Sequence, residues 1–415
     1  MKPSLRFSLA CALAGGVPGC PALAQPATPV AATVAPARFT MAQALDAAWA
    51  RSLESAEASG RQRQAEAQQR VAGSWLAGAP TLEWSQREGR GAAAAGSRET
   101  EIGLALPLWR LGQAQQNAQA AQAESDWAAA AERAARLRLA AQLREQAGRL
   151  RLAEADARQA ARQRQLLEEL GGDVERRVQA GDLAPADAMA ARAEMLSART
   201  LEAEAQQSLA TQRSAWALLS GAPTLPEPEP IAAGEDAALE QHAEAQLAEA
   251  AVQRSRQRVK EVQAQRGSPP ELGLGWRQER PGLGQAQQHS LALSLRLPLG
   301  QDPHSQPRLA AALAEQDLAL LQQQRLRPQL EAELALARGQ LSAVTLQLEA
   351  ESERARLLSE RARLLKKSFQ AGESALPELL RALSAAAQAE AGAARQQAAL
   401  AQARARLQQA LGQLP

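Results

Sequence analysis

The sequence has few aromatic residues, no tyrosine and no large excess of charge of either sign. Aromatic residues make up 2% of the 415 positions, and the formal net charge is +2. So few aromatic side chains leave little material for a compact globular core, and the balanced charge gives no indication of nucleic-acid binding. The apolar residues are mainly alanine and leucine, mixed with glutamine, glutamate and arginine. This mixture is typical of long helices and coiled coils.

The first residues have the pattern of a secretory signal peptide. Lys2 and Arg6 precede an apolar stretch over 7–17, and residues 22–24 (Ala-Leu-Ala) form a small-residue cleavage site. The apolar stretch is too short to anchor the chain in a bilayer. We therefore expect a signal peptide over 1–24, followed by an extended segment over 25–39.

A second interpretation of the same segment remains open. Residues 17–20 (Val-Pro-Gly-Cys) loosely resemble a lipoprotein box, in which Cys20 would carry the lipid. Pro18 fits such a box poorly, so we favour simple cleavage over lipidation.

Cysteine and histidine are too sparse to build a reactive or metal-binding centre. Both cysteines, Cys11 and Cys20, lie inside the predicted signal peptide, so its removal excludes a disulfide framework and a thiolate metal site. The three histidines, His242, His289 and His304, are far apart in the sequence. We find no Ser-His-Asp arrangement and no phosphate-binding loop. The sequence therefore predicts no catalytic residues, no cofactor, no metal site and no enzymatic activity.

The chain contains an internal duplication. Pro107 and Pro298 occupy the same place in two Leu-X-Leu-Pro-Leu motifs. We call the number of positions between these two prolines the repeat offset, because it relates each residue of the first unit to its equivalent in the second. Two further pairs of landmarks share this offset, Gly181 with Gly372 and Gly221 with Gly412. Landmarks that share one spacing indicate tandem structural units. We therefore predict a first repeat over 40–221 and a second over 236–415, joined by a proline-rich linker over 222–235.

Each repeat is predicted to contain a helix, a strand pair, a very long helix and a return helix. The first helices are predicted over 41–76 and 237–265, and the long helices over 112–178 and 306–369. At 1.5 Å per residue, each long helix would measure about 100 Å. Pro328 favours a kink in the second long helix. After Pro328 a 4-3 spacing of apolar residues predicts a coiled-coil seam.

Two strand pairs are predicted, over 80–109 and 270–299, because leucine alternates there with small or polar residues. An apolar face suited to lipid, with a polar face suited to water, is the pattern of an outer-membrane barrel. The residues predicted to face lipid are Leu82, Trp84, Ile102, Leu104, Leu106, Leu272, Leu274, Trp276, Leu291, Leu293, Leu295 and Leu297. Trp84, Trp109 and Trp276, near the predicted strand ends, suit an interfacial aromatic girdle. The alternative is that these hairpins pack on a soluble core, for which no segment is apolar enough.

Four strands cannot close a barrel in a single chain. Open sheet edges are excluded from the hydrocarbon of a membrane, and bacterial barrels have an even number of at least eight strands. A dimer would supply eight strands and a trimer twelve. Side chains fill the interior of an eight-stranded barrel, so a homotrimer is favoured because it leaves a lumen.

The order of elements resembles that of the TolC-like outer-membrane factor (outer membrane efflux protein) family, over nearly the whole chain after the signal peptide. Residues 177–188 (Arg-Val-Gln-Ala-Gly-Asp-Leu-Ala-Pro-Ala-Asp-Ala), 369–380 (Phe-Gln-Ala-Gly-Glu-Ser-Ala-Leu-Pro-Glu-Leu-Leu) and 405–412 are similar to its heavy-metal cation efflux (CzcC-like) branch. The fold class that this resemblance implies is mainly α with a small β part. Duplicated long-helix coiled coils would form an α-barrel, and four strands per chain would contribute to a trimeric 12-stranded outer-membrane β-barrel.

The resemblance implies a passive conduit of a tripartite efflux system. It would lie in the lipid of the cell outer membrane and extend into the periplasm. There it would meet a periplasmic adaptor (membrane fusion protein) and an inner-membrane RND-type pump, and the branch implies heavy-metal cations as substrate. An outer-membrane duct for multidrug efflux or type I protein secretion is an alternative, because the pump chooses the cargo. A periplasmic coiled-coil adaptor or scaffold is a more remote alternative, since it would lack hairpins patterned for lipid.

The turns after the two long helices are candidates for a periplasmic tip or gate. Glycine permits the left-handed conformation that ends a helix, and Gly181 and Gly372 are expected to adopt it. Asp182 and Glu373 follow directly. In the family that the chain resembles, these turns form the tip where the tunnel narrows and the adaptor binds.

Two further carboxylates match a family position at the constriction, Asp187 and Glu378. Three copies of each would form a negative ring that attracts cations. One turn further along, Ala190 and Arg381 stand where the family has acidic residues, and Arg381 could neutralise Glu378. Capping of the return helices is a sufficient alternative explanation for both carboxylates.

Overall fold

The computed structural model describes residues 39–90, 96–227, 239–265, 267–282, 284–298 and 305–415. The predicted signal peptide, residues 25–38 of the extended segment and most of the linker lie outside these residues, as does His304.

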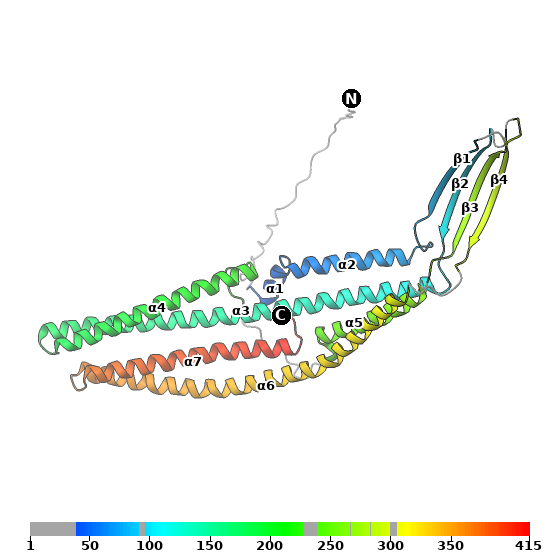
Figure 1. Cartoon of the computed structure of the whole chain (residues 1–415). Coiled ribbons are helices and arrows are strands. Elements are labelled where there is room, and N and C mark those ends of the chain that lie inside the picture. Colours follow the sequence, from blue (N-terminus) through cyan, green and yellow to red (C-terminus); the bar gives the residue numbers. More distant parts are fainter. Residues whose placement is uncertain (1–38, 91–95, 228–238, 266, 283, 299–304) are drawn as a thin grey trace, which may run out of the picture. The chain divides into compact units, whose positions relative to one another are not determined.

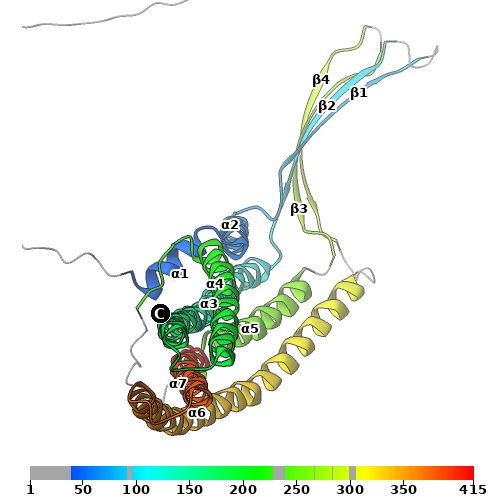
Figure 2. The same ribbon diagram turned by 90° about the vertical axis from the view of Figure 1, so that its left-hand side faces the viewer.

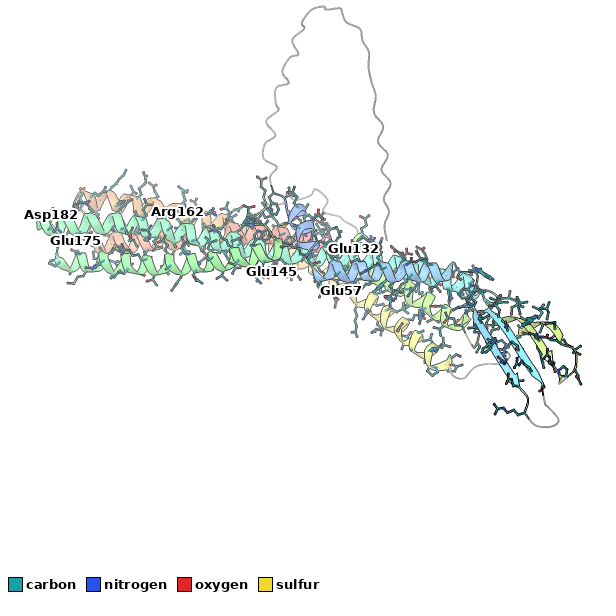
Figure 3. The ribbon with its side chains drawn as sticks, turned by 90° about the horizontal axis from the view of Figure 1, so that it is seen from above. Glu57, Glu132, Glu145, Arg162, Glu175 and Asp182 are labelled. Carbon is teal, nitrogen blue, oxygen red and sulfur yellow. The ribbon has the colours of Figure 1, made fainter. Side chains whose placement is uncertain are left out.

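The helices follow the order of the predicted duplication (Figure 1). The first repeat contains α1 (Met41–Trp49), α2 (Leu53–Ala72), α3 (Gln113–Ala180) and α4 (Pro185–Ser220). The second contains the 3-10 turn η1 (Leu239–Gln241), α5 (Ala243–Ala264), α6 (Gln306–Gln370) and α7 (Leu376–Ala410). Alanine, leucine and straight-chain polar residues dominate these segments, and these residue types have high helix propensity. Charged side chains project along the length of the helices (Figure 3).

The single helix predicted over 41–76 is wrong, because the structure divides it into α1 and α2. Ser52 lies at the break. Its hydroxyl donates to the carbonyl of Trp49 at 3.0 Å and accepts the amide of Ser55 at 3.1 Å. A serine side chain that satisfies backbone groups in this way replaces helix continuation with an N-cap. The helix α2 also ends at Ala72, earlier than predicted.

The helix α6 continues through Pro328. Its chain passes from the α5 neighbourhood to the α7 neighbourhood as one element, with a gradual curve in the ribbon (Figure 2). Apolar residues of the predicted seam are buried after the proline. They are Leu330, Ala337, Ala355, Ala362 and Phe369.

The helix α3 is the central helix of the described residues. It packs against α2 and α4 of its own repeat and against α5 and α7 of the other repeat. The helix α6 packs mainly against α5 and α7 and therefore lies at an edge of this arrangement. The long helices α3 and α6 are continuous (Figure 1). Shorter helices pack along them, α2 and α4 along α3, and α5 and α7 along both.

The four strands form one antiparallel sheet in the order β1-β2-β3-β4. Their bounds are Thr81–Glu88 for β1, Arg98–Pro107 for β2, Glu271–Arg280 for β3 and Gln288–Arg296 for β4. The two predicted strand pairs are joined by β2 and β3, where Ile102 is opposite Trp276. Among the described residues, the strands β1 and β4 each have an edge with no partner strand.

The two repeats also share a side-chain contact at the C-terminal end of the return helix. Arg51 donates to the carbonyl of Leu219 at 3.1 Å and covers Gly221, whose φ is +73°. His242, the equivalent of Arg51 in the second repeat, lies against Gly412, whose φ is +72°. A β-carbon on Gly412 would lie 2.7 Å from Cδ2 of His242, so both contacts require glycine. The duplication therefore extends to side-chain packing.

Candidate functional site

One face of the sheet is apolar and exposed. The register places the residues predicted to face lipid in three rows, with Leu297 just beyond the end of β4. The rows are Leu106-Leu272-Leu295, Leu82-Leu104-Leu274-Leu293 and Trp84-Ile102-Trp276-Leu291. Leu293 is 73% exposed and Leu291 is 86% exposed. Contiguous apolar surface of this kind marks a site of contact with a partner or a membrane.

Two of the three predicted girdle tryptophans lie inside strands, so their placement near strand ends was wrong. Trp84 and Trp276 share the last apolar row, and Trp276 stacks on His289 of the following polar row at a centroid distance of 5.6 Å. Backbone pairing does not need apolar side chains, and the strands therefore continue beyond the apolar pattern. Trp109 lies outside the strands and donates its indole N–H to the carbonyl of Ser74 at 2.8 Å.

The opposite face of the sheet is polar and carries ion pairs between strands. Arg277 of β3 lies 2.8 Å from Glu99 of β2 and 3.4 Å from Glu279. Arg87 of β1 approaches Glu99 at 3.8 Å. Such charged cross-strand contacts suit a face in contact with water.

The two candidate tip turns have the same geometry. Gly181 has φ +87° and Gly372 has φ +81°. In each turn the amide of the next residue donates to a carbonyl five residues earlier, at 2.9 Å for Asp182 and 3.0 Å for Glu373. This is the Schellman arrangement that ends helices. Asp182 lies at the end of the helices opposite to the sheet (Figure 3).

Asp187 caps its own helix. Its Oδ2 accepts the amide of Ala184 at 3.3 Å, and the side chain is half-buried. Glu378 has the equivalent position in α7 and is exposed. Arg381 donates Nε to the carbonyl of Pro377 at 3.2 Å, and the ion pairs of the described residues include none between Arg381 and Glu378. The structure therefore gives Asp187 a capping role and leaves the charge of Glu378 available to solvent.

Arg177 joins the ends of the two long helices, a role that the sequence did not indicate. Its guanidinium donates to the carbonyls of Phe369 at 3.0 Å and Gln370 at 2.8 Å, and it lies 5.0 Å from the ring centroid of Phe369. A cation at a helix C-terminus is stabilised by the unpaired carbonyls and the helix dipole. The equivalent residue of the second repeat is Ser368, which lacks this charge. The contact is therefore specific to one of the two repeats.

Replacing Arg177 with glutamine is expected to loosen the last turn of α6. The variant loses two charge-assisted hydrogen bonds, each worth about 1.5–3 kcal/mol. Hydrogen exchange of the amides at 366–370 should accelerate by at least tenfold. Arg176→Gln is the matched control, because Arg176 is exposed and its one ion pair among the described residues is with Asp173 at 3.4 Å. Equal exchange rates in the two variants would contradict the bridging role of Arg177.

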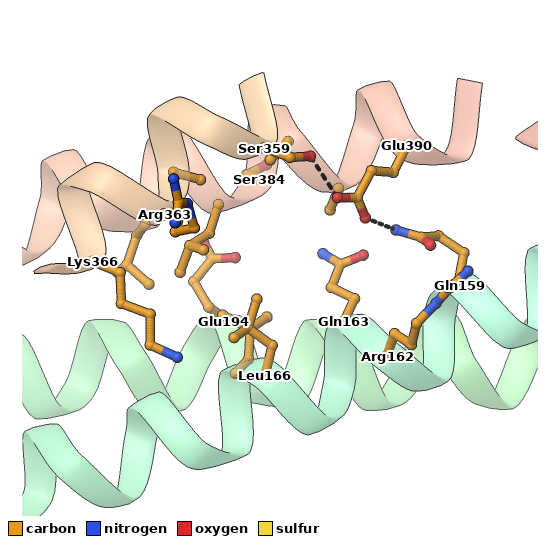
Figure 4. A pocket seen from close by; sticks show the side chains of 16 residues that line it. Gln159, Arg162, Gln163, Leu166, Glu194, Ser359, Arg363, Lys366, Ser384 and Glu390 are labelled. Carbon is orange, nitrogen blue, oxygen red and sulfur yellow. Dashed lines mark hydrogen bonds between the residues drawn. The ribbon is translucent and has the colours of Figure 1, made fainter. Parts of the chain in front are cut away.

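A groove near the tip lies between the α3/α4 and α6/α7 hairpins (Figure 4). Glu390 lines this groove, and its carboxylate accepts hydrogen bonds from Gln159 at 2.9 Å and from Ser359 at 2.5 Å. Arg363, on its rim, donates to Glu360 and holds the pKa of that carboxyl below its usual range. The charge of Arg363 is thus paired within the chain.

The described residues lack two kinds of feature. They contain no group of three or more His, Cys, Asp or Glu side chains able to hold a metal ion. No helix in this part of the chain is long and apolar enough to cross a membrane.

Comparison with solved structures gives the fold. A scan against protein-family models finds no match, and a search of curated proteins finds none. The chain superposes on the outer membrane protein VceC from Vibrio cholerae with a TM-score of 0.72, at 18% identity, covering 90% of this chain and 96% of VceC. It also matches CusC, which forms a transmembrane channel, with a TM-score of 0.73 at 18% identity. This match covers 90% of this chain and 92% of CusC. The protein has the fold of these channels.

A third solved structure agrees. The open state of the MtrE outer membrane channel from Neisseria gonorrhoeae matches with a TM-score of 0.68, at 22% identity, covering 90% of this chain and 89% of MtrE. These matches confirm the predicted fold class, which is mainly helical with a small antiparallel sheet.

Proposed function

We propose that this protein is the outer-membrane channel subunit of a tripartite efflux system and acts as a passive conduit. The observation that carries the proposal is the sheet, whose exposed apolar face opposes a charged face. A bilayer on one side and a water-filled lumen on the other satisfy both faces. The likeness of fold to the outer membrane protein VceC and to the channels CusC and MtrE supports the channel part of this proposal.

Three copies of the chain would complete the channel. The free edges of β1 and β4 need partners in hydrocarbon, and joining β4 of one copy to β1 of the next supplies them. Three copies give twelve strands, which is enough to enclose a lumen. The apolar residues from Leu82 to Leu297 that were predicted to face lipid would then form the outer surface of this barrel.

The helices would extend from the outer membrane into the periplasm. The turns at Gly181 and Gly372 would form the tip, with Asp182 and Glu373 beside them. A periplasmic adaptor (membrane fusion protein) would bind there, and an inner-membrane RND-type pump would supply the energy. The turns suit a docking role because their backbone groups are largely satisfied within the chain and their side chains are exposed.

Heavy-metal cations are the proposed cargo, on the basis of the resemblance to the CzcC-like branch. The described residues contain no metal-holding cluster, and a conduit requires passage rather than tight binding. Exposed carboxylates near the tip, Glu378 and Asp182, favour the entry of cations.

Single-channel recording in planar bilayers tests the proposed function. Detergent-extracted protein should insert and conduct ions in discrete steps. Correctly assembled protein that binds bilayers without any conductance would contradict the proposal.

Neutralising the tip carboxylates should reduce the preference of the channel for cations. Asp187→Asn keeps an oxygen that can accept the Ala184 amide, and Glu378→Gln keeps the side-chain length. The double variant should assemble normally, with weaker cation preference and weaker block by divalent ions. Arg381→Ala removes a positive charge and should shift both properties in the opposite direction. Unchanged selectivity and block in the double variant would leave Asp187 as a helix cap only and Glu378 without a role in conduction.

A further inference from the structure

The apolar face of the sheet stops short of the end that lies away from the helices (Figure 1). Residues paired directly across strands, and alternate residues along one strand, lie on the same face. The apolar row that contains Trp276 is therefore followed, on the same face, by two polar rows. They are Gln86-Thr100-Gln278-His289 and, at the end of the sheet, Glu88-Arg98-Arg280. We call the last of these the basic row.

The basic row has an excess of positive charge. Arg98 of β2 is directly opposite Arg280 of β3, and both are exposed. An oxygen of Glu88 lies 2.8 Å from a guanidinium nitrogen of Arg98 and balances that charge. Arg280 forms no ion pair or hydrogen bond with the described part of the chain. Because like charges directly opposite each other destabilise a sheet, an anion beside Arg280 would stabilise this end.

The other border of the same apolar face carries no charge among the described residues. Its last row is Leu106-Leu272-Leu295. Two positions nearer to the helices, the strands continue with Leu108, Pro270 and Leu297. The charged residues at this border, Glu271 and Arg296, lie on the opposite face of the sheet and pair there at 3.2 Å. The two borders of the apolar face therefore differ in charge.

The spacing of the rows fits a bilayer. The path along β2 from Leu106 to Arg98 measures about 27 Å, at about 3.4 Å per residue. A strand tilt of about 40° reduces this path to about 21 Å along the membrane normal, compared with about 25 Å for the apolar band of an outer-membrane barrel. In the orientation of the proposed function, the guanidinium groups of Arg98 and Arg280 would lie where the hydrocarbon meets the headgroups.

We propose that Arg280 and Arg98 bind the phosphate of an anionic lipid in the membrane leaflet farther from the helices. A guanidinium can donate two parallel hydrogen bonds to phosphate. Arg98 donates to Glu88 through one nitrogen, and its guanidinium carries further N–H donors. The acyl chains of the same lipid would lie on the apolar rows, which distinguishes a lipid from free phosphate as the ligand. The inference rests on the proposed function, which places these rows in the bilayer, and adds the class of lipid and the residues that bind it.

Trp276 and His289 lie between the apolar rows and the basic row. Their rings stack at a centroid distance of 5.6 Å. Tryptophan prefers the level of the membrane–water interface, because its ring has an apolar body and a polar N–H. The stacked pair would therefore contact the part of the lipid between its phosphate and its acyl chains.

Titration of the detergent-extracted protein with lipid A tests the site. Lipid A carries phosphomonoester groups, and dephosphorylated lipid A keeps the same acyl chains without them. Native mass spectrometry counts the lipid molecules that remain bound. The unchanged protein should bind lipid A at least about tenfold more tightly than the dephosphorylated lipid, because only the phosphate accepts charge-assisted hydrogen bonds. Arg280→Gln should reduce this preference, and Arg98→Gln/Arg280→Gln should abolish it.

Arg87→Gln is the matched control. Arg87 is an exposed arginine at the same end of the sheet, but it lies on the opposite face and approaches Glu99 at 3.8 Å. This variant should keep the full preference for lipid A. An equal preference in the unchanged protein and in the Arg98/Arg280 double variant would overturn the lipid site. Displacement of lipid A by an equal concentration of inorganic phosphate would indicate a site for free phosphate and would also overturn it.

Conductance in planar bilayers separates this inference from the proposed function. The Arg98/Arg280 double variant should assemble and conduct like the unchanged protein, because both side chains lie on the face of the sheet away from the proposed lumen. A conducting channel without any preference for lipid A would overturn the lipid site and leave the proposed function intact. An unchanged protein that does not conduct would contradict the proposed function and, with it, the placement of the basic row in a membrane.

Discussion

Replacing Leu293 with arginine is expected to destabilise the inserted protein by about 2–4 kcal/mol per copy, the cost of arginine facing lipid near the midplane of a bilayer. Leu293 is 73% exposed and lies in the middle of the three apolar rows, beside Leu274. Every copy in the proposed trimer would carry the change. We therefore expect a large loss of protein from the outer-membrane fraction and a lower urea midpoint in lipid vesicles.

Ser294→Arg is the matched control, one residue along the same strand. Ser294 is also exposed, but it lies on the opposite, polar face, opposite Gly273. Arginine there would meet water and the charged side chains of that face, so its effect on urea unfolding should be small. Equal losses for Leu293→Arg and Ser294→Arg would show that the sheet does not separate lipid from water.

Replacing Trp216 with alanine should give the largest loss of stability among single changes in the helices. The side chain is fully buried where α4 meets α1 and α3, and its indole N–H donates to the carbonyl of Thr224 at 3.0 Å. Removing a buried tryptophan costs about 3–5 kcal/mol. The change should appear as a lower urea midpoint for the loss of helical signal.

Trp75→Ala controls for the loss of an indole as such. Trp75 is 74% exposed, and exposed substitutions usually change the free energy of unfolding by less than about 0.5 kcal/mol. A similar midpoint for Trp216→Ala and Trp75→Ala would contradict the packing described around Trp216.

The sequence predicts the fold where a periodic pattern or a repeat is strong. Alternating leucines predict the sheet and its apolar face, and the shared offset of the proline and glycine landmarks predicts that the order of elements repeats. The break between α1 and α2 was not predicted. The Ser52 hydroxyl competes with the helix for backbone hydrogen-bonding groups. A single serine in an otherwise helical pattern does not show that this competition will end the helix. The placement of Trp84 failed for a different reason, since strands can continue beyond their apolar residues.

The candidate tip could be predicted only as far as its local turns. Gly181 and Gly372 mark helix ends through their own backbone preference, which the sequence expresses directly. The bridge from Arg177 to Phe369 joins residues 192 positions apart, and no local pattern indicates it. The pairing of Arg381 with Glu378 was an expectation from helical spacing, but the arginine instead bonds a carbonyl of its own helix. Long side chains have several partners within reach, and spacing does not choose among them.

The number of copies in the membrane-extracted protein tests the central claim most directly. Native mass spectrometry of the detergent-extracted protein should give three times the mass of the mature chain, because three sheets of four strands would close one barrel in the proposed assembly. Disruption of the sheet should separate the complex into single copies. A stable single copy that keeps its full strand content in water would contradict the account, because its apolar sheet face would need neither lipid nor partners.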